Sequence, residues 1–255
     1  MENERHGIHI DIYKMRKSAA DEKILSYNDA VLRRSDLDIL SGPYFLNYRI
    51  IEFYFSYLPS CYPSEEFVLV SPSIAFWIAN CPDIESFKDF VEPLNLSSKK
   101  LVIFPVNNND DVTEAEGGNR WSLHANVSVL HDSYGGLNAG LAKQLYRAIV
   151  GYMGISDMAS ACKYVVCSKT PQQVNGYNCG LYVATIVNPS VVDKMRTVIL
   201  RLVKSLMSMN YRDSGIEEKR GMDPLYKSVM FSMGNCHWNR EHSHPFHRGV
   251  GMVEL

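Results

Sequence analysis

The stretch that most constrains the fold is residues 170–182, where a loop runs directly into a small apolar segment. Pro171 and the Asn-Gly pair at 175–176 are typical of a turn-rich loop. The residues that follow Cys179 are small and apolar, which predicts a buried helix beginning at this cysteine. The first turn of a helix offers free N–H groups and the positive end of the helix dipole. Both favour the thiolate, which is the nucleophilic form of cysteine.

A glutamine on the same loop adds a second chemical element. Gln173 lies six residues before Cys179, and its side-chain amide can donate to an oxyanion while backbone N–H groups near the cysteine donate from the other side. A single cysteine at a helix start is more often structural than catalytic. The catalytic interpretation therefore depends on the glutamine, the Asn-Gly pair and the Cys-Gly pair occurring together.

This combination resembles the active-site signature of the ubiquitin-like-protein proteases (the Ulp/SENP cysteine peptidases), which reads Gln-x-Asn-x-x-Asp-Cys-Gly. Gln173, Asn175, Cys179 and Gly180 match it, and Asn178 stands where the family has aspartate. The resemblance implies that Cys179 is the nucleophile and that Gln173 holds the oxyanion.

A second motif contains the most serious departure from the family. Residues 117–123 read Gly-Gly-Asn-Arg-Trp-Ser-Leu, which resembles the family pattern Gly-Gly-x-His-Trp-Ser-Leu. Arg120 occupies the position of the histidine that serves as general base, and arginine cannot accept a proton near neutral pH. Asp132 matches the aspartate that orients this histidine, although the intervening hairpin is about five residues shorter than in the family. His124 is a weak substitute, because the strand would have to slip by four residues to bring it into place.

A third segment resembles the family's Trp-Leu-Asn-Asp motif and the helix that it opens. Phe45, Asn47 and Tyr48 stand at the Trp, Asn and Asp positions. In the deneddylase branch this motif contacts the narrow Gly-Gly tail of the modifier, so the resemblance implies a substrate-binding slot between Phe45 and Trp121, without the carboxylate that Tyr48 replaces. Judged without the resemblance, these residues are core aromatics at a helix start.

Residues 70–107 again resemble the deneddylase branch, nearly without gaps. The implied fold is α+β, a papain-like cysteine peptidase of the Ulp type with a mixed central sheet flanked by helices.

The apolar patterns predict helices at 46–58, 84–92, 141–150 and 191–209, and strands at 67–70, 101–106 and 163–167. Ser71-Pro72 predicts a helix cap, and the strand at 101–106 is expected to end at its proline. We expect a protease domain at 23–209, a flexible extension at 1–22 and a disordered tail at 210–255.

Composition narrows the remaining possibilities. The 255 residues are 46% hydrophobic, enough for one sizeable core, and a net charge of −2 gives no footprint for nucleic acid. No apolar run is long enough to span a bilayer, so we expect no membrane partner. Six scattered cysteines suit reduced thiols in the cytosol or nucleus. Cys236 and the four nearby tail histidines fit no standard zinc spacing; zinc remains a minor alternative to a metal-free tail, and we expect no cofactor.

The resemblance implies a monomeric cysteine peptidase that cleaves after the Gly-Gly terminus of a Nedd/Rub ubiquitin-like modifier, processing its precursor or removing it from neddylated proteins such as cullins. Arg120 predicts that this activity is impaired. Two alternatives remain open. The first alternative to an impaired peptidase is a catalytically inactive pseudoprotease that still binds the modifier. The second is the product of an altered transcript, which would fold poorly.

Overall fold

The computed structural model of the protein describes residues 19–81, 83–109, 111, 113, 117–125, 129–153, 165–185, 189–210 and 253–254. Most of the expected N-terminal extension and most of the expected 210–255 tail, including Cys236 and the tail histidines, lie outside these residues. In chain order the elements are β1 (Lys23–Tyr27), β2 (Ala30–Arg33), α2 (Arg34–Ser41), α3 (Tyr48–Cys61), β3 (Phe67–Leu69), α4 (Pro72–Asn80), α5 (Ile84–Val91), the short 3-10 helices η1 (Glu92–Leu94) and η2 (Leu96–Ser98), β4 (Leu101–Asn107), β5 (Trp121–Ala125), β6 (Val129–His131), α6 (Ala139–Ile149), η3 (Val150–Tyr152), β7 (Val165–Val166), α8 (Cys179–Ala184), α9 (Pro189–Asn210) and β8 (Val253–Glu254).

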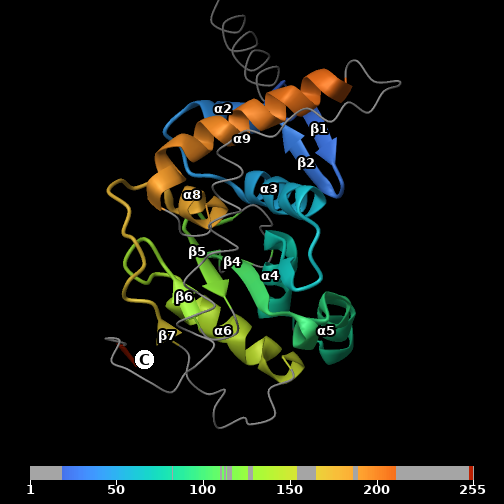
Figure 1. The fold of residues 1–255 in the computed structure, drawn as a ribbon, viewed down its shortest axis with the longest axis vertical. Coiled ribbons are helices and arrows are strands. Elements are labelled where there is room, and N and C mark those ends of the chain that lie inside the picture. Colours follow the sequence, from blue (N-terminus) through green and yellow to red (C-terminus); the bar gives the residue numbers. More distant parts are fainter. Residues whose placement is uncertain are drawn as a thin grey trace, which may run out of the picture.

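The central sheet is mixed, as the sequence predicts. Its strand order is β3-β4-β5-β6-β7-β8, with β3–β4 and β6–β7 parallel and the other neighbours antiparallel. Figure 1 shows α9 across one end of the molecule beside α2 and the β1–β2 hairpin, whereas α5 and α6 lie toward the opposite end. The helices predicted at 46–58, 84–92, 141–150 and 191–209 are α3, α5, α6 and α9.

The sheet separates two hydrophobic cores. Along β4, Ile103 packs into the core formed with α3, α8 and α9, whereas Val102 and Phe104 pack into the core formed with α4 and α6. This division follows from the two-residue period of a strand, which sends successive side chains to opposite faces. Cys179 belongs to the first core.

Local sequence explains where several helices begin. Asn47 caps α3, its side-chain Oδ1 accepting from the backbone N of Ile50 at 3.1 Å. Ser71 caps α4 in the same way, with Pro72 in the first turn, which confirms the predicted strand-to-cap transition. Within the described part of the chain, no helix is both long and apolar enough to cross a membrane.

Strand β4 continues past the proline where the sequence predicted its end. Pro105 lies inside the strand and faces Leu123 of β5, and β4 runs on to Asn107. The neighbouring strand β3 pairs with β4 only as far as Ile103, so no β3 residue stands opposite Pro105. The missing N–H of proline is tolerated there because that side of β4 is an edge.

Candidate active site

The loop that precedes α8 delivers Cys179 to the first position of this helix, as predicted. The side-chain oxygen of Asn175 accepts from the backbone N atoms of Tyr177 and Asn178, at 3.1 and 3.0 Å, and closes the turn before the cysteine. Gly180 permits close packing, since a Cβ there would lie 2.8 Å from the Cβ of Leu46. The chain is thereby fixed on both sides of the cysteine.

The thiol of Cys179 lies in a tightly packed place. The residue is 1% exposed, and its Sγ lies 3.6 Å from the carbonyl oxygen of Asn119. Burial raises the pKa of the Cys179 thiol above its ordinary value; the backbone N–H groups of Trp121 and Gly180 and the charge of Arg120 act in the opposite direction, and the charge of Asp132 adds to the rise. The N–H group of Gly180 at the helix start lowers the thiol pKa, as expected, but desolvation outweighs it.

Arg120 holds together three segments around the thiol. Its guanidinium carbon lies 4.8 Å from the ring centre of Phe45 and 4.4 Å from that of Tyr134. Its Nη1 donates to the carbonyl oxygen of Gly176, in the loop that carries the cysteine. The side chain at the family's histidine position is thus packed against two aromatic rings and tied to the Cys179 loop.

Asp132 is buried directly after β6, and its carboxylate is held by neighbours on the same side of the sheet. Ser122 Oγ donates to Oδ2 at 2.9 Å, and the backbone N atoms of Tyr134 and Asn138 donate at 2.7 and 3.3 Å. The Asn138 amide also donates to Ser122 Oγ at 2.8 Å. Among the described residues, no histidine or arginine forms a hydrogen bond or ion pair with Asp132. Its orienting role has no base to act on there, so that role stays a prediction.

The two described histidines have contacts of their own. His124 belongs to the other core, with ring centres 6.4 Å from Phe104 and 6.5 Å from Tyr146. His124 stands opposite Phe104 in the β4–β5 register, so in this structure the strand has not slipped by the four residues that would make His124 a substitute base. His131 places Nδ1 3.0 Å from the hydroxyl of Thr170.

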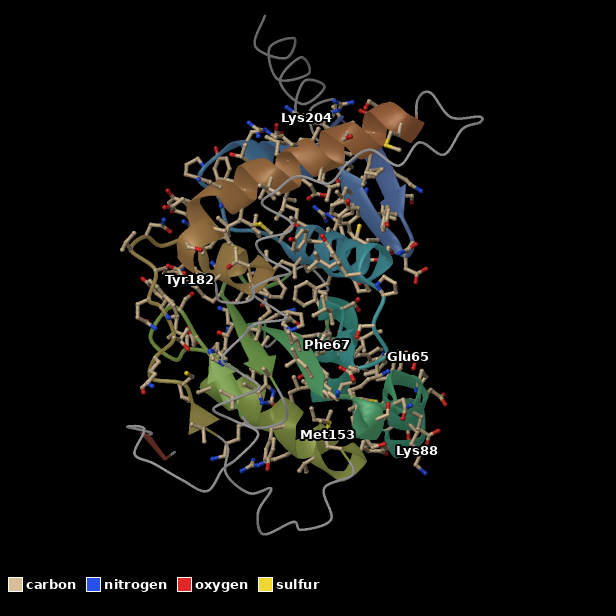
Figure 2. All side chains as sticks on the ribbon, in the orientation of Figure 1. Glu65, Phe67, Lys88, Met153, Tyr182 and Lys204 are labelled. Carbon is tan, nitrogen blue, oxygen red and sulfur yellow. The ribbon has the colours of Figure 1, made fainter. Side chains whose placement is uncertain are left out.

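Gln173 lies in the loop before the cysteine with its amide engaged locally. Nε2 donates to the carbonyl oxygen of Asn175 at 2.6 Å, and Oε1 accepts from Ser133 Oγ at 3.1 Å. An oxyanion role would require Nε2 to exchange this partner, so that role stays a prediction. On α8, the hydroxyl of Tyr182 donates to the carbonyl oxygen of Gln172 at 3.4 Å, which connects the helix to the same loop. Tyr182 is labelled in Figure 2.

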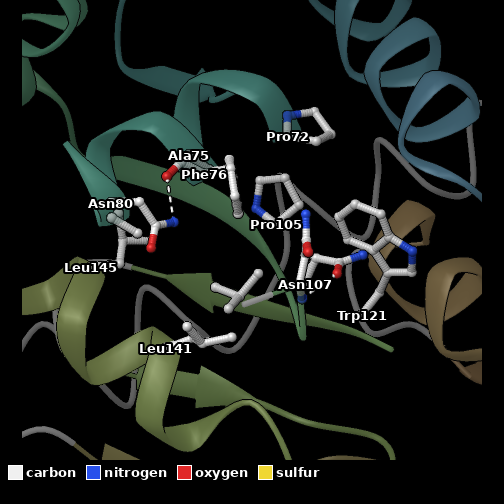
Figure 3. Close-up of a pocket in the computed structure, with 12 residues that line it drawn as sticks. Pro72, Ala75, Phe76, Asn80, Pro105, Asn107, Trp121, Leu141 and Leu145 are labelled. Carbon is white, nitrogen blue, oxygen red and sulfur yellow. Dashed lines mark hydrogen bonds between the residues drawn. The ribbon is translucent and has the colours of Figure 1, made fainter. Parts of the chain in front are cut away.

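The aromatic residues of the expected tail slot lie near one another. The indole N–H of Trp121 donates to the carbonyl oxygen of Leu46 at 2.8 Å, directly after Phe45 in sequence. Trp121 is 3% exposed and also borders a small pocket beside Pro105 and Asn107, between α4, β4 and α6 (Figure 3). The two rings therefore belong to one region, and the ring of Phe45 is covered by Arg120.

The other two expected binding residues have structural contacts. Asn47 caps α3 through its oxygen, and its Nδ2 donates to Asp36 Oδ1 at 2.6 Å. The ring of Tyr48 lies 5.6 Å from the guanidinium carbon of Arg49. Sequence reasoning did not select Tyr134 or Asn138, which contact Arg120 and Asp132. The Gly-Gly pair after Tyr134 was the available signal, because it marks a tight turn at the end of the strand that precedes Asp132.

Solved structures establish the class of fold. The structure of a de-sumoylating protease matches with a TM-score of 0.56 at 18% identity, covering 81% of this chain and 97% of that one. The Ulp1 protease domain in complex with Smt3, the yeast orthologue of SUMO, matches with a TM-score of 0.53 at 16% identity, covering 76% and 93%. The molecule is therefore an α+β, papain-like cysteine peptidase fold of the Ulp type.

Sequence relatives define the family more narrowly. No protein-family model matches the chain. NEDD8-specific protease 1 of Arabidopsis thaliana is 45% identical over 225 residues, covering 76% of this chain and 98% of the relative. The probable sentrin-specific protease 8 of Dictyostelium discoideum is 30% identical over 229 residues, covering 84% and 86%. The chain belongs to the Ulp/SENP family of cysteine-type ubiquitin-like-protein proteases, in its deneddylase branch.

Proposed function

We propose that this protein recognises a NEDD8-type modifier by its Gly-Gly terminus, and that its hydrolysis of the bond after that terminus is severely impaired. One observation carries the proposal: Arg120, which the motif aligns with the family's general base, has its guanidinium held against Phe45 and Tyr134. The site retains a cysteine at a helix start and a buried carboxylate beside it.

The chemistry of a cysteine peptidase explains the expected impairment. A general base must take the proton from the thiol and later return it to the leaving amine. Arg120 stays protonated and can only stabilise a thiolate by its charge. Because burial raises the pKa of the Cys179 thiol, the neutral form predominates at neutral pH. Nucleophile and carboxylate are present, but proton transfer between thiol and leaving group lacks a carrier among the described residues.

Modifier binding would not require a general base, and the aromatic residues expected to bind the tail are present in this chain. Phe45 and Trp121 support an aromatic slot that admits Gly-Gly and excludes larger side chains, while the globular surface of the modifier would supply most of the affinity. Tyr48 stands where the family has a carboxylate. We therefore expect binding weaker than in active relatives by about 1–3 kcal/mol, the usual effect of losing a charged hydrogen-bond partner. Neddylated proteins such as cullins are the proposed partners.

A paired experiment tests this function. NEDD8 carrying a C-terminal fluorophore would be incubated with the wild-type protein and with Cys179→Ala, and NEDD8 and SUMO binding would be titrated in parallel. We expect NEDD8 binding with turnover close to that of Cys179→Ala. Turnover well above the Cys179→Ala background would contradict the impairment. Equal or tighter binding of SUMO would overturn the branch assignment at the level of binding, and no binding of either would overturn modifier recognition.

A further inference from the structure

The guanidinium of Arg120 is fixed in place without an anionic partner. In the described part of the chain its one hydrogen bond is from Nη1 to the carbonyl oxygen of Gly176, and it forms no ion pair, not even with Asp132. By contrast, Arg49 contacts Asp36 through a charged pair at 3.0 Å, and Arg34 contacts Glu22 at 2.6 Å. Since arginine has five N–H donors in a planar fork, most of the donors of Arg120 remain available.

The side chain is also held in one orientation. The rings of Phe45 and Tyr134 both contact the guanidinium, and the bond to Gly176 restricts it further. A guanidinium stacked on aromatic rings loses less conformational freedom when it forms new hydrogen bonds. Tyr134 is 40% exposed, so this cluster is open to solvent on at least one side. Such an arrangement suits a bidentate acceptor, for which carboxylate has the matching geometry.

The backbone places this guanidinium next to the thiol. The two neighbours of Arg120 both act on Cys179: the carbonyl oxygen of Asn119 lies 3.6 Å from Sγ, and the backbone N–H of Trp121 lowers the pKa of the thiol, as does the charge of Arg120 itself. If the modifier binds as proposed above, the last carbonyl carbon of its Gly-Gly terminus lies at Sγ. A tail that ends there in a free acid therefore presents its carboxylate to Arg120.

We propose that Arg120 makes this site a receptor for the free C-terminal carboxylate of a mature modifier, in preference to the amide or isopeptide form that a peptidase would cleave. This inference rests on the proposed function, because it requires the Gly-Gly tail to reach Cys179. A neutral thiol favours it, since a thiolate would repel the incoming carboxylate. The charge of Asp132 opposes it. The Asp132 oxygens, however, already accept from Ser122, Tyr134 and Asn138, whereas the ligand would contact the guanidinium directly.

The test compares three forms of NEDD8 that differ only at the C-terminus: the free acid, the C-terminal amide, and a precursor with residues after Gly-Gly. Each would be titrated by calorimetry against the wild-type protein and against Arg120→Gln, Arg120→Lys and Arg201→Gln. Arg201 is an exposed arginine on α9, so its replacement removes one positive charge without touching the Arg120 cluster. Thermal unfolding of each variant shows whether it is folded.

We expect the free acid to bind the wild-type protein about tenfold more tightly than the amide, which corresponds to about 1.4 kcal/mol. The preference should disappear in Arg120→Gln, persist in Arg201→Gln and be reduced in Arg120→Lys, which retains charge but not the planar fork. It should also shrink as salt is raised.

Three outcomes would overturn the proposal that Arg120 binds the free carboxylate of the modifier. Equal binding of acid and amide by the wild-type protein would refute it while leaving modifier recognition intact. Tighter binding of all three forms by Arg120→Gln would show that the arginine obstructs the tail slot instead. No binding of any form would refute both this inference and the proposed function.

Discussion

Replacing Arg120 by histidine should restore proteolysis, because the neighbours that a base needs are already in position. The backbone on both sides of residue 120 acts on the Cys179 thiol: the carbonyl oxygen of Asn119 lies 3.6 Å from Sγ, and the N–H of Trp121 lowers the thiol pKa. Residues 120 and 122 fall on the same face of an extended chain, and Ser122 bonds to Asp132. An imidazole at 120 is therefore expected to lie between the thiol and the carboxylate.

The gain in catalytic rate expected for Arg120→His can be compared with the loss of folding stability expected for the same substitution. A positioned general base contributes about 10²–10⁴-fold in rate, which is about 3–5 kcal/mol of transition-state stabilisation. Arg120→His gives up two ring contacts worth about 0.5–1 kcal/mol each and a partly exposed hydrogen bond worth about 1 kcal/mol, or about 2–3 kcal/mol in total. For a domain of this size that lowers Tm by about 4–12 °C. The variant should remain folded and gain activity.

The assay is release of a fluorophore from the C-terminus of NEDD8, measured from pH 5 to pH 9. Turnover by Arg120→His should rise as the new imidazole loses its proton, near pH 6.5 for an ordinary histidine, and continue to rise as the buried thiol ionises. Arg120→Gln is the matched control, because it loses the same contacts without providing a base. Equal rates for the histidine and glutamine variants would refute the reasoning, as would no gain in a folded Arg120→His protein.

Three further predictions concern the thiol, the buried ion pair and the tail slot. A NEDD8 probe with an electrophilic C-terminus should label Cys179 faster as pH rises into the alkaline range, because burial raises its pKa; a rate independent of pH, or equal labelling of the other described cysteines, would contradict this. In urea unfolding, Asp36→Ala should lower the free energy of unfolding by about 3–5 kcal/mol, because it removes the carboxylate that pairs with the buried Arg49. Glu22→Ala, in an exposed pair, should lower it by at most about 1 kcal/mol, and similar losses would count against the burial argument. Phe45→Ala should weaken NEDD8 binding and Trp77→Ala, an exposed aromatic on α4, should not; equal effects in a titration would exclude a specific slot.

The sequence was sufficient where a short pattern determines local structure. The start of α8 at Cys179 and the cap of α4 at Ser71 follow from loop residues, cap residues and the first apolar positions after them. The β1–β2 hairpin was not predicted, because its turn depends on Asn28 in a left-handed conformation, φ 48°, and not on a glycine. A hairpin turn that places a residue other than glycine in the left-handed conformation is difficult to recognise from sequence.

The surroundings of Arg120 could not be predicted for a different reason. Phe45, Tyr134 and Gly176 are far from Arg120 in sequence, and only tertiary packing brings them together. The same applies to the Cys179 pKa, since the helix start is visible in the sequence but the desolvation that outweighs it is not. Motif positions can therefore nominate candidate site residues, whereas the contacts of these residues require the fold.

The resemblance implies two separate changes, a shortened hairpin and an arginine at the histidine position, and only the second would remove the base. Leu123 pairs with His131 and Ala125 with Val129, so the next position of the same register sets Ser122 opposite Asp132. The hydrogen bond of 2.9 Å between these two side chains agrees with that register. The register therefore keeps the Asp132 carboxylate beside β5, the strand that begins at Trp121. What separates this site from a complete Cys-His-Asp arrangement is the side chain at position 120, and arginine there supplies a fixed positive charge where a proton carrier would stand.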